Sequence, residues 1–240
     1  MTAGRPDWKR VGLLIPSSNT VMEVDFYRHL PPPVTVHTAR MFMESTTAQG
    51  ENRMLDEFTV PAAVAVGTAR PDVVVFGCTS AGALRGNAYD AELCQRIAES
   101  TQATAISVIR SVRDAIARRG GRRVGVITPY VDELNAKIRA SIEHSGDVEV
   151  VDIVGLGLDE NFTIAEVEPR AIVDFAVEQF GSQSIDLLFA SCTNFRAVDA
   201  LPGLEAALGV PVVTSNQATL EAVRRELAFS PTLAGQASTS

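Results

Sequence analysis

Short apolar runs alternate with longer segments of helical periodicity along most of the chain. Four runs in the first half have the valine and isoleucine content of buried parallel strands, at 10–16, 34–39, 72–77 and 104–108. Four more such runs follow at 123–129, 148–154, 185–190 and 210–215. Between them lie amphipathic segments such as 131–146, where Gly146 is predicted to end a helix. The alternation predicts an α/β fold with parallel sheets.

The two halves of the chain repeat each other at a nearly constant spacing. KRVGLLIP aligns with RRVGVITP, which places Pro16 over Pro129 at an offset of 113. PDVVVFGCTS aligns with IDLLFASCTN at an offset of 114, which places Cys78 over Cys192, and VTV at 34 falls on VEV at 148 with the same offset. The repeat predicts two similar lobes, each a four-stranded parallel sheet flanked by helices, related by a pseudo-two-fold axis.

The predicted boundaries follow from this repeat. Residues 1–118 form the expected N-terminal lobe, and residues 119–216 form the second lobe. The helical pattern of QATLEAVRREL is assigned to a C-terminal helix over 217–228 that crosses back onto the first lobe. Residues 229–240 are small, polar and unpatterned, so we expect them to be disordered.

Composition and charge exclude several classes of partner. The 240 residues are 46% hydrophobic and 21% charged, which is typical of soluble globular proteins. With 21 basic and 29 acidic residues the net charge is −8, which argues against binding to nucleic acid or anionic membranes. The densest basic run, RRGGRR at 118–123, reads as a solvated turn. No apolar run has the length of a membrane span or the features of a signal peptide, so we expect a cytoplasmic protein.

Two of the three cysteines occupy equivalent places in the repeat. Cys78 and Cys192 each lie just past the carboxyl end of the third strand of their lobe. Ligands of open parallel sheets bind outside the carboxyl ends of the strands, so we expect both thiols at one site between the lobes. A thiol between a strand and a helix also faces the N–H groups and dipole of that helix, which favour the thiolate. We therefore interpret both residues as catalytic.

The remaining cysteine and the other common motifs offer no second site. A buried cysteine is usually a small hydrophobic residue, and this interpretation fits Cys94. The histidines, at 29, 37 and 144, lie apart from the cysteines, and CxxC spacing is missing, so we predict no metal. The glycine-rich signatures of dinucleotide-binding and P-loop proteins are also missing from the sequence, so we predict no cofactor.

Polar residues cluster at the same predicted strand ends and are candidates for binding a small carboxylate. Hydroxyl, amide and phenol groups suit carboxylate oxygens, although the serines of PSSNT also suit the start of a helix. The DEN loop after the sixth strand is expected to reach over the site. The candidate substrate-binding residues are Ser17, Asn19, Thr79, Ser80, Tyr130, Asn161, Thr193 and Asn194.

With these residues in place, the chain resembles the aspartate/glutamate racemase superfamily over nearly its full length. It is most similar to the branch of maleate cis-trans isomerases, arylmalonate decarboxylases and ectoine-utilisation proteins. The resemblance rests on PSSNTVME, the two cysteines, TPY and the DEN loop. It implies a cofactor-independent enzyme with a paired-cysteine site between two lobes, and a homodimer or a higher homo-oligomer.

The resemblance leaves the substrate open. The segment GCTSAGALRGNAYDAEL, with Arg85 and Gly86, looks more like the decarboxylases, yet those enzymes carry glycine where this chain has Cys78. The leading hypothesis is isomerisation of a cis dicarboxylate such as maleate, with the Cys78 thiolate adding to the double bond and Cys192 transferring a proton. The alternatives are a two-cysteine racemase or epimerase for an amino-acid or ectoine-type substrate, a decarboxylase of the same superfamily, and a non-enzymatic carboxylate-binding protein.

Overall fold

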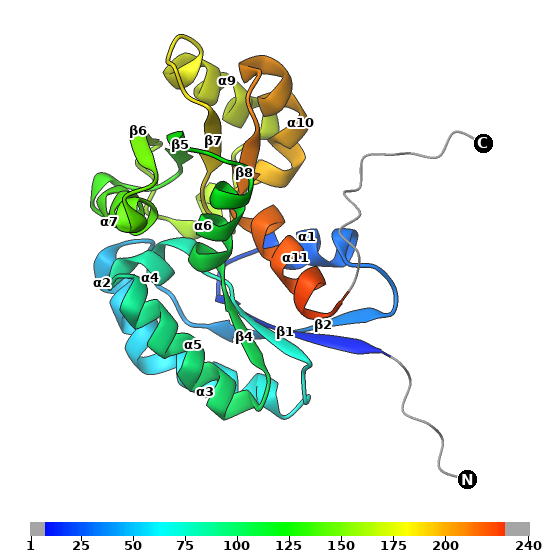
Figure 1. Ribbon diagram of the computed structural model, residues 1–240. Helices are drawn as coiled ribbons and strands as arrows, with labels where there is room; N and C mark the ends of the chain where they lie inside the picture. The colour runs from blue at the N-terminus through cyan, green and yellow to red at the C-terminus, as the bar shows by residue number, and fades with distance from the viewer. Residues whose placement is uncertain (1–7, 229–240) are drawn as a thin grey trace, which may run out of the picture.

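The eight predicted strands form two parallel sheets, one in each half of the chain. The computed structural model describes residues 8–228 (Figure 1), so the tail predicted to be disordered lies outside the described residues. The first sheet has the order β2-β1-β3-β4 and the second has the order β6-β5-β7-β8. The strands are β1 Lys9–Pro16, β2 Val34–Met41, β3 Val73–Phe76, β4 Thr104–Ser107, β5 Arg123–Thr128, β6 Glu149–Gly155, β7 Leu187–Ala190 and β8 Val212–Thr214.

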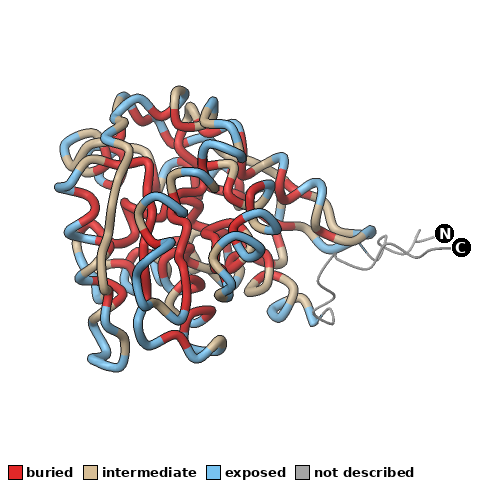
Figure 2. Tube along the Cα trace, turned by 90° about the horizontal axis from the view of Figure 1, so that it is seen from above, coloured by how far each residue is buried: buried red, intermediate tan, exposed pale blue. Residues whose placement is uncertain are grey.

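Helices cover both faces of each sheet (Figure 1). Buried segments run through the middle of the molecule and exposed ones lie at its outside (Figure 2). The strands β3 and β7 are buried along their whole length, which explains their continuous apolar sequences. Gly146 takes a left-handed conformation and ends the helical segment before β6, as predicted. The helices are α1 Met22–His29, α2 Ala48–Arg53, the π-helix η1 Met54–Phe58, α3 Thr59–Gly67, α4 Thr79–Leu84, α5 Asn87–Thr101, α6 Val108–Arg118, α7 Asp132–Ile142, the 3₁₀ helix η2 Glu143–Ser145, α8 Asn161–Glu166, α9 Pro169–Phe180, α10 Ala197–Leu208 and α11 Ser215–Glu226.

The repeat in the sequence corresponds to a repeat in the structure. In each lobe the first strand pairs with the second and the third, and the third pairs with the fourth. Asp72 and Asp186, which align in the repeat, make equivalent hydrogen bonds, because each accepts backbone N–H groups at the start of the first strand of its lobe. Asp72 accepts from Arg10 at 2.7 Å, and Asp186 accepts from Arg122 and Arg123 at 3.1 Å. The prediction of two similar α/β lobes is confirmed.

The last described helix joins the two lobes. α11 follows β8 of the second sheet and packs against α1, α6, β3 and β4 of the first half. Its first turn is capped by Thr214, whose hydroxyl accepts the N–H of Gln217 at 3.1 Å. Glu221 on α11 forms ion pairs with Arg119 at 2.6 Å and with Arg118 at 3.5 Å. The basic run at 118–123 contains the turn between α6 and β5, as expected, but three of its arginines are paired, because Arg123 also binds Glu149 at 2.7 Å.

Candidate active site

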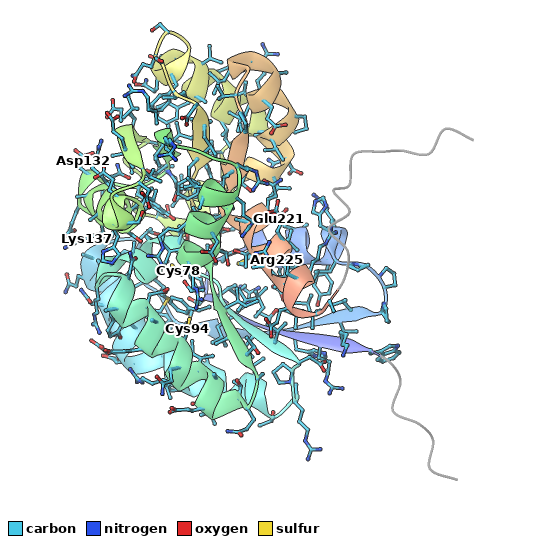
Figure 3. The ribbon with its side chains drawn as sticks, in the orientation of Figure 1. Cys78, Cys94, Asp132, Lys137, Glu221 and Arg225 are labelled. Carbon is cyan, nitrogen blue, oxygen red and sulfur yellow. The ribbon has the colours of Figure 1, made fainter. Side chains whose placement is uncertain are left out.

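Cys78 lies at the junction of β3 and α4, where the chain turns from the sheet into the helix. It is the N-cap residue of α4 and is only 5% exposed (Figure 3). Its sulfur lies 3.8 Å from the hydroxyl of Ser80, and the backbone N–H of Ala81 lowers the pKa of the thiol. The first lobe thus presents a buried thiol at the start of a helix.

Cys192 lies at the equivalent junction of the second lobe, after β7, and is also 5% exposed. Its φ of 103° lies in the region that favours glycine, a strain of about 1–3 kcal/mol for a residue with a side chain. The sulfur accepts hydrogen bonds from the backbone N–H groups of Asn194, at 3.2 Å, and of Phe195. The backbone of Cys192 is therefore strained in the conformation that brings its sulfur to these N–H donors.

The two cysteine turns lie side by side. A negative charge on Cys192 would raise the pKa of Cys78, and a charge on either cysteine would raise the pKa of the Tyr130 phenol. The Tyr130 hydroxyl donates a hydrogen bond to the sulfur of Cys192. One hydroxyl fastens the two cysteine turns together, because Ser215 Oγ accepts from Thr79 Oγ1 at 2.9 Å and from the N–H of Cys192 at 3.1 Å.

Close packing of the second lobe holds Tyr130 at this position. Its backbone N–H donates to Thr128 Oγ1 at 3.1 Å, and its carbonyl accepts from Gly157 at 3.2 Å. A Cβ on Gly155 would lie 2.1 Å from that carbonyl, so the close approach of the two segments requires glycine. The phenol is buried, and burial together with the charges of the two cysteines raises its pKa well above the ordinary value. Tyr130 is therefore a hydrogen-bond donor at neutral pH.

Burial outweighs the N–H donors in setting the charge of the thiols. The sequence-based expectation that these positions favour the thiolate was only half right, because the donors are present but the sites are almost dry. Desolvation, followed by the charge of Glu51, raises the pKa of Cys78 well above its ordinary value. Desolvation also raises the pKa of Cys192, to about 11. Both cysteines are neutral thiols at rest, and a thiolate has to be generated during the reaction.

Asn19 and Thr193 connect the lobes directly beside the cysteines. The amide of Asn19 donates to Thr193 Oγ1 at 3.0 Å, and that hydroxyl donates to the carbonyl of Gly77 at 3.1 Å. The Asn19 side-chain oxygen accepts the N–H groups of Val21 and Met22. Asn19 is thus buried at the first strand-to-helix turn, next to the residue that precedes Cys78, with one amide N–H left for a ligand.

The other predicted binding residues extend this network. Asn194 Oδ1 accepts from the N–H groups of Thr20 and Val21, and its amide donates to the carbonyl of Asn161 at 2.6 Å. The side chain of Asn161 donates to Ser18 Oγ at 2.9 Å. We expected Asn161 in a loop, whereas it is the first residue of α8. The DEN segment does approach the first lobe, because the Thr46 N–H donates to the carbonyl of Asp159 at 2.7 Å.

Ser17 is the predicted site residue with the most clearly structural contact. Its hydroxyl accepts the N–H of Met43 at 3.1 Å, and its own N–H donates to the carbonyl of Met41. The side chain is half-buried and ties the end of β1 to the segment that follows β2. Its expected contact with substrate stays a prediction.

Sequence reasoning missed one acidic residue at the site. Glu51, on α2, is fully buried, and Ser80 donates a hydrogen bond to its Oε1. Desolvation is the main cause that raises the pKa of this carboxyl to about 8. The signal was present in the helical spacing, because Glu51 lies three residues from Ala48 and four from Leu55 and so shares their apolar face. A carboxylate on that face points into the protein.

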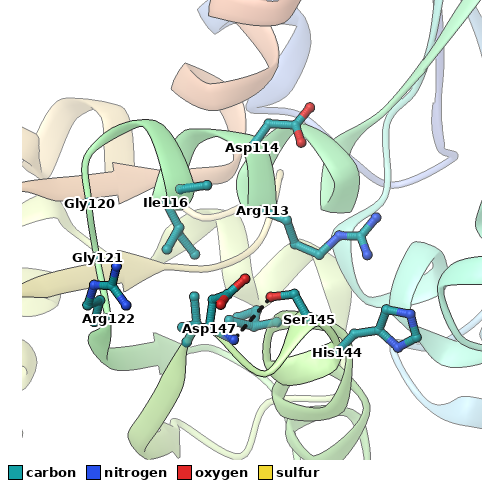
Figure 4. A pocket seen from close by; sticks show the side chains of 12 residues that line it. Arg113, Asp114, Ile116, Gly120, Gly121, Arg122, His144, Ser145 and Asp147 are labelled. Carbon is teal, nitrogen blue, oxygen red and sulfur yellow. Dashed lines mark hydrogen bonds between the residues drawn. The ribbon is translucent and has the colours of Figure 1, made fainter.

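The surface cavity shown in Figure 4 is separate from the cysteines. It has a volume of about 610 Å³ and lies between the end of α6 and the η2 segment. Side chains of both signs line it, among them Arg113, Asp114, Arg122 and Asp147. Within residues 8–228, no group of three or more histidine, cysteine, aspartate or glutamate residues is placed to hold a metal ion. No helix in the same range is both long and apolar enough to cross a membrane.

Comparisons with known proteins agree with this architecture. A maleate isomerase from Geobacillus stearothermophilus is 26% identical over 231 residues, which cover 91% of each chain. Arylmalonate decarboxylase from Bordetella bronchiseptica is 28% identical over 209 residues, 87% of this chain and 86% of the relative. The crystal structure of the maleate isomerase Iso from Pseudomonas putida S16 matches with a TM-score of 0.85 and 26% identity, over 93% of this chain and 94% of that one.

A second solved structure comes from the decarboxylase branch. It is a liganded mutant of arylmalonate decarboxylase in which a glycine is replaced by cysteine and a cysteine by serine, with a TM-score of 0.83 and 27% identity over 91% of this chain and 92% of that one. The family model for arylmalonate decarboxylase matches residues 11–239. Since that match spans nearly the whole chain, this protein belongs to the arylmalonate decarboxylase family.

Proposed function

We propose that this protein is a cofactor-independent isomerase that converts a cis dicarboxylate of the maleate type into its trans isomer. The observation that carries the proposal is the pair of buried thiols, Cys78 and Cys192, whose turns are joined through the hydroxyl of Ser215. The similarity to maleate isomerases over 91% of the chain supports the substrate class. One solved relative, a cysteine-to-alanine variant of the maleate isomerase Iso from Pseudomonas putida S16, was crystallised with maleate.

The first step is addition of Cys78 to the double bond. The S–H bond of Cys78 breaks, an S–C bond forms to one alkene carbon, and the π electrons move to the other carbon and its carboxylate. The former double bond is now single, so the two halves of the substrate rotate about it. Return of the electrons expels the thiolate and leaves the trans product. A cysteine-to-serine mutant of a maleate isomerase of the same fold, from Nocardia farcinica, holds a covalently bound succinylcysteine intermediate.

On the opposite side of the substrate, Cys192 transfers a proton and Tyr130 stabilises the charge on Cys192. Cys192 gives a proton to the carbon that gained the electrons and removes it again before elimination. The hydroxyl of Tyr130 donates to the Cys192 sulfur and stabilises the thiolate that remains after Cys192 has given up its proton. The different surroundings of the two cysteines suit different roles, whereas a two-base racemase would use both thiols in the same role.

The substrate carboxylates bind to the donors that remain around the thiols. Asn19 and Asn194 each keep one amide N–H that the inter-lobe network does not use. Thr79, Ser80, Thr193 and Asn161 complete the polar surroundings in this proposal, and Ser17 supports the turn that carries Asn19. Donors aimed at the carboxylates also stabilise the negative charge that develops when sulfur adds.

The direct test is a panel of substrates incubated with the purified protein without added cofactor. We expect maleate to give fumarate in the proton NMR spectrum. Arylmalonates test the decarboxylase branch, to which the chain is also similar, and α-amino dicarboxylates in deuterated water test a racemase by labelling at Cα. Conversion of arylmalonate or exchange at Cα, with maleate unchanged, would contradict the isomerase proposal.

Replacing Tyr130 with phenylalanine removes the hydroxyl that donates to Cys192. We expect kcat/KM for maleate to fall about tenfold to a hundredfold, since a hydrogen bond to a charged group contributes about 1.5–3 kcal/mol. Loss of the donor also raises the pKa of Cys192 further above 11, so the thiol keeps its proton to higher pH and the loss of the remaining activity in alkaline solution shifts to higher pH. A pH series of initial rates measures both effects. Unchanged kcat/KM would show that the phenol takes no part.

We also propose that the protein works in the cytoplasm as a homo-oligomer. All three cysteines are free, as is usual in a reducing compartment. On α1 the side chains of Val24 and Tyr27 are 41% and 62% exposed, which suits a face that packs on a second copy. Light scattering of the purified protein determines the stoichiometry.

A further inference from the structure

Glu51 lies one hydroxyl away from the proposed nucleophile. Ser80 donates to Oε1 of Glu51 in a short hydrogen bond, and the same hydroxyl lies 3.8 Å from the sulfur of Cys78. The second carboxyl oxygen of Glu51, Oε2, is buried and has no hydrogen-bond partner among the described residues. Cys78, Ser80 and Glu51 therefore form a continuous chain of groups that can exchange protons.

Burying a carboxyl group without a cation beside it lowers the stability of the folded protein, so its presence here suggests a functional role. The charges that act between Glu51 and its neighbours come from acids, namely Glu133 on α7 and the side chains of Cys78, Cys192 and Tyr130. Two arginines near Glu51, one close in sequence and one bound to its neighbour Asn52, are engaged elsewhere. Arg85, which binds the neighbouring Asn52, is paired with Asp56 at 2.7 Å, and Arg53 is paired with Glu44 and Glu57. No ion pair in the described structure explains Glu51.

We propose that Glu51, acting through the hydroxyl of Ser80, takes up the proton that Cys78 must lose when its sulfur attacks. The inference rests on the proposed function for the identity of the attacked bond, but the proton transfer itself involves only residues of this chain. Glu51 does not touch the substrate in this arrangement. It is a positioning residue that determines where the proton is held.

The transfer balances without any other reactant. The proton of the Cys78 thiol moves to Ser80 Oγ while the hydroxyl proton of Ser80 moves to Oε1 of Glu51, which turns the carboxylate into a carboxylic acid. The negative charge thus passes from Glu51 to sulfur and, as the S–C bond forms, to the substrate. Elimination returns the thiolate, and the same two protons move back in the opposite direction. The hydroxyl of Ser80 is restored in both directions.

The pH dependence follows from the charge of Glu51. With its pKa raised to about 8, about one molecule in ten carries the carboxylate at pH 7, and most carry it one unit above the pKa. The proton acceptor therefore becomes available as the pH rises through about 8. The reactivity of Cys78 should rise over the same range, below the pKa of the thiol itself.

The experiment compares the wild-type protein with Glu51→Gln. Both proteins are treated with the neutral reagent iodoacetamide over a pH series, and modification of Cys78 is followed by peptide mass spectrometry. We expect the wild-type rate to rise with a midpoint near pH 8. In Glu51→Gln that rise should disappear, and the rate one unit above the midpoint should be lower by about tenfold or more.

The direction in which Glu51→Gln changes the rate of Cys78 modification distinguishes proton transfer through Ser80 from a simple effect of the Glu51 charge. The negative charge of Glu51 raises the pKa of Cys78, so if charge alone mattered, Glu51→Gln would react faster than the wild type. Ser80→Ala, which keeps the carboxyl but breaks the chain, should lose the same rise. Glu57→Gln, an exposed glutamate six residues away, should behave as the wild type.

Any of three results would overturn the proposal. These are a Glu51→Gln variant that reacts as fast as or faster than the wild type, a Ser80→Ala variant with an unchanged pH profile, and a wild-type Cys78 that does not react above pH 8. Thermal unfolding of each variant identifies loss of fold. Because the reagent replaces the substrate, failure of maleate turnover would leave this result unaffected, and the two proposals are tested separately.

Discussion

Replacing Cys78 with serine should reduce kcat for maleate by about a thousandfold or more while leaving binding of the dicarboxylate intact. A serine hydroxyl is far harder to ionise than a thiol, and the burial that already raises the pKa of Cys78 would act on serine in the same direction. The volume change is small and no hydrogen bond of the inter-lobe network uses the Cys78 side chain. Proton NMR measures the turnover, and isothermal titration calorimetry with maleate or fumarate measures the binding.

Cys94 provides the matched control for this substitution. It lies on α5, in the helical layer of the first lobe, and is partly exposed (Figure 3). Desolvation raises its pKa to about 12, so it is no more a resting thiolate than the other two. Cys94→Ser should retain the wild-type rate. Wild-type turnover by Cys78→Ser would remove covalent catalysis by this residue from the mechanism.

Replacing Cys192 with serine should stop turnover in a different way, by leaving the substrate attached to Cys78. Addition of sulfur needs Cys78, whereas the proton on the neighbouring carbon is removed by Cys192 before elimination. Slow protonation of the intermediate by water then gives a saturated adduct that has no base to release it. We expect kcat to fall by about a hundredfold to ten-thousandfold. Intact-protein mass spectrometry should show a gain equal to one molecule of maleic acid.

The position of the adduct decides between the two assignments. Peptide mapping of Cys192→Ser after incubation with maleate should place the adduct on the peptide that contains Cys78. The double variant Cys78→Ser, Cys192→Ser should carry none. Adduct formation on Cys192 in the Cys78→Ser variant, at a rate that supports turnover, would reverse the roles of nucleophile and proton donor.

Much of the fold was predictable from the sequence because its signals are local and duplicated. Runs such as VVVF and LLFA are apolar throughout since their strands are buried on both faces, so their ends are easy to place. The repeated Asp72 and Asp186 kept the two halves in alignment because each fills the same structural need. The positions of Cys78 and Cys192 followed from topology alone, since parallel sheets place their ligand sites at one edge.

The missed features depend on contacts that no local pattern encodes. Glu51 is 27 residues from Cys78, and its approach depends on how α2 packs on α4, although its helical spacing indicated burial. The hydrogen bond from Asn19 to Thr193 joins positions 174 apart, so a motif in either lobe could not show that the amide is already partly occupied. The expectation that the two positions favour a thiolate failed for the same reason. The sequence shows that each cysteine precedes a helix, whereas the exclusion of water from the site depends on how the two lobes pack together.

The hydrogen bonds that fasten the two cysteine turns also restrict how small molecules exchange with solvent. Swinging the lobes apart would break the contacts of Asn19, Thr79, Asn194 and Ser215 together, at the point where the reaction takes place. Displacing the loop that carries Thr46 from the one that carries Asp159 disturbs a single described backbone hydrogen bond between them. Separation of these two loops therefore breaks fewer hydrogen bonds than separation of the lobes, and it leaves the contacts of Thr79 and Ser215 beside the cysteines in place.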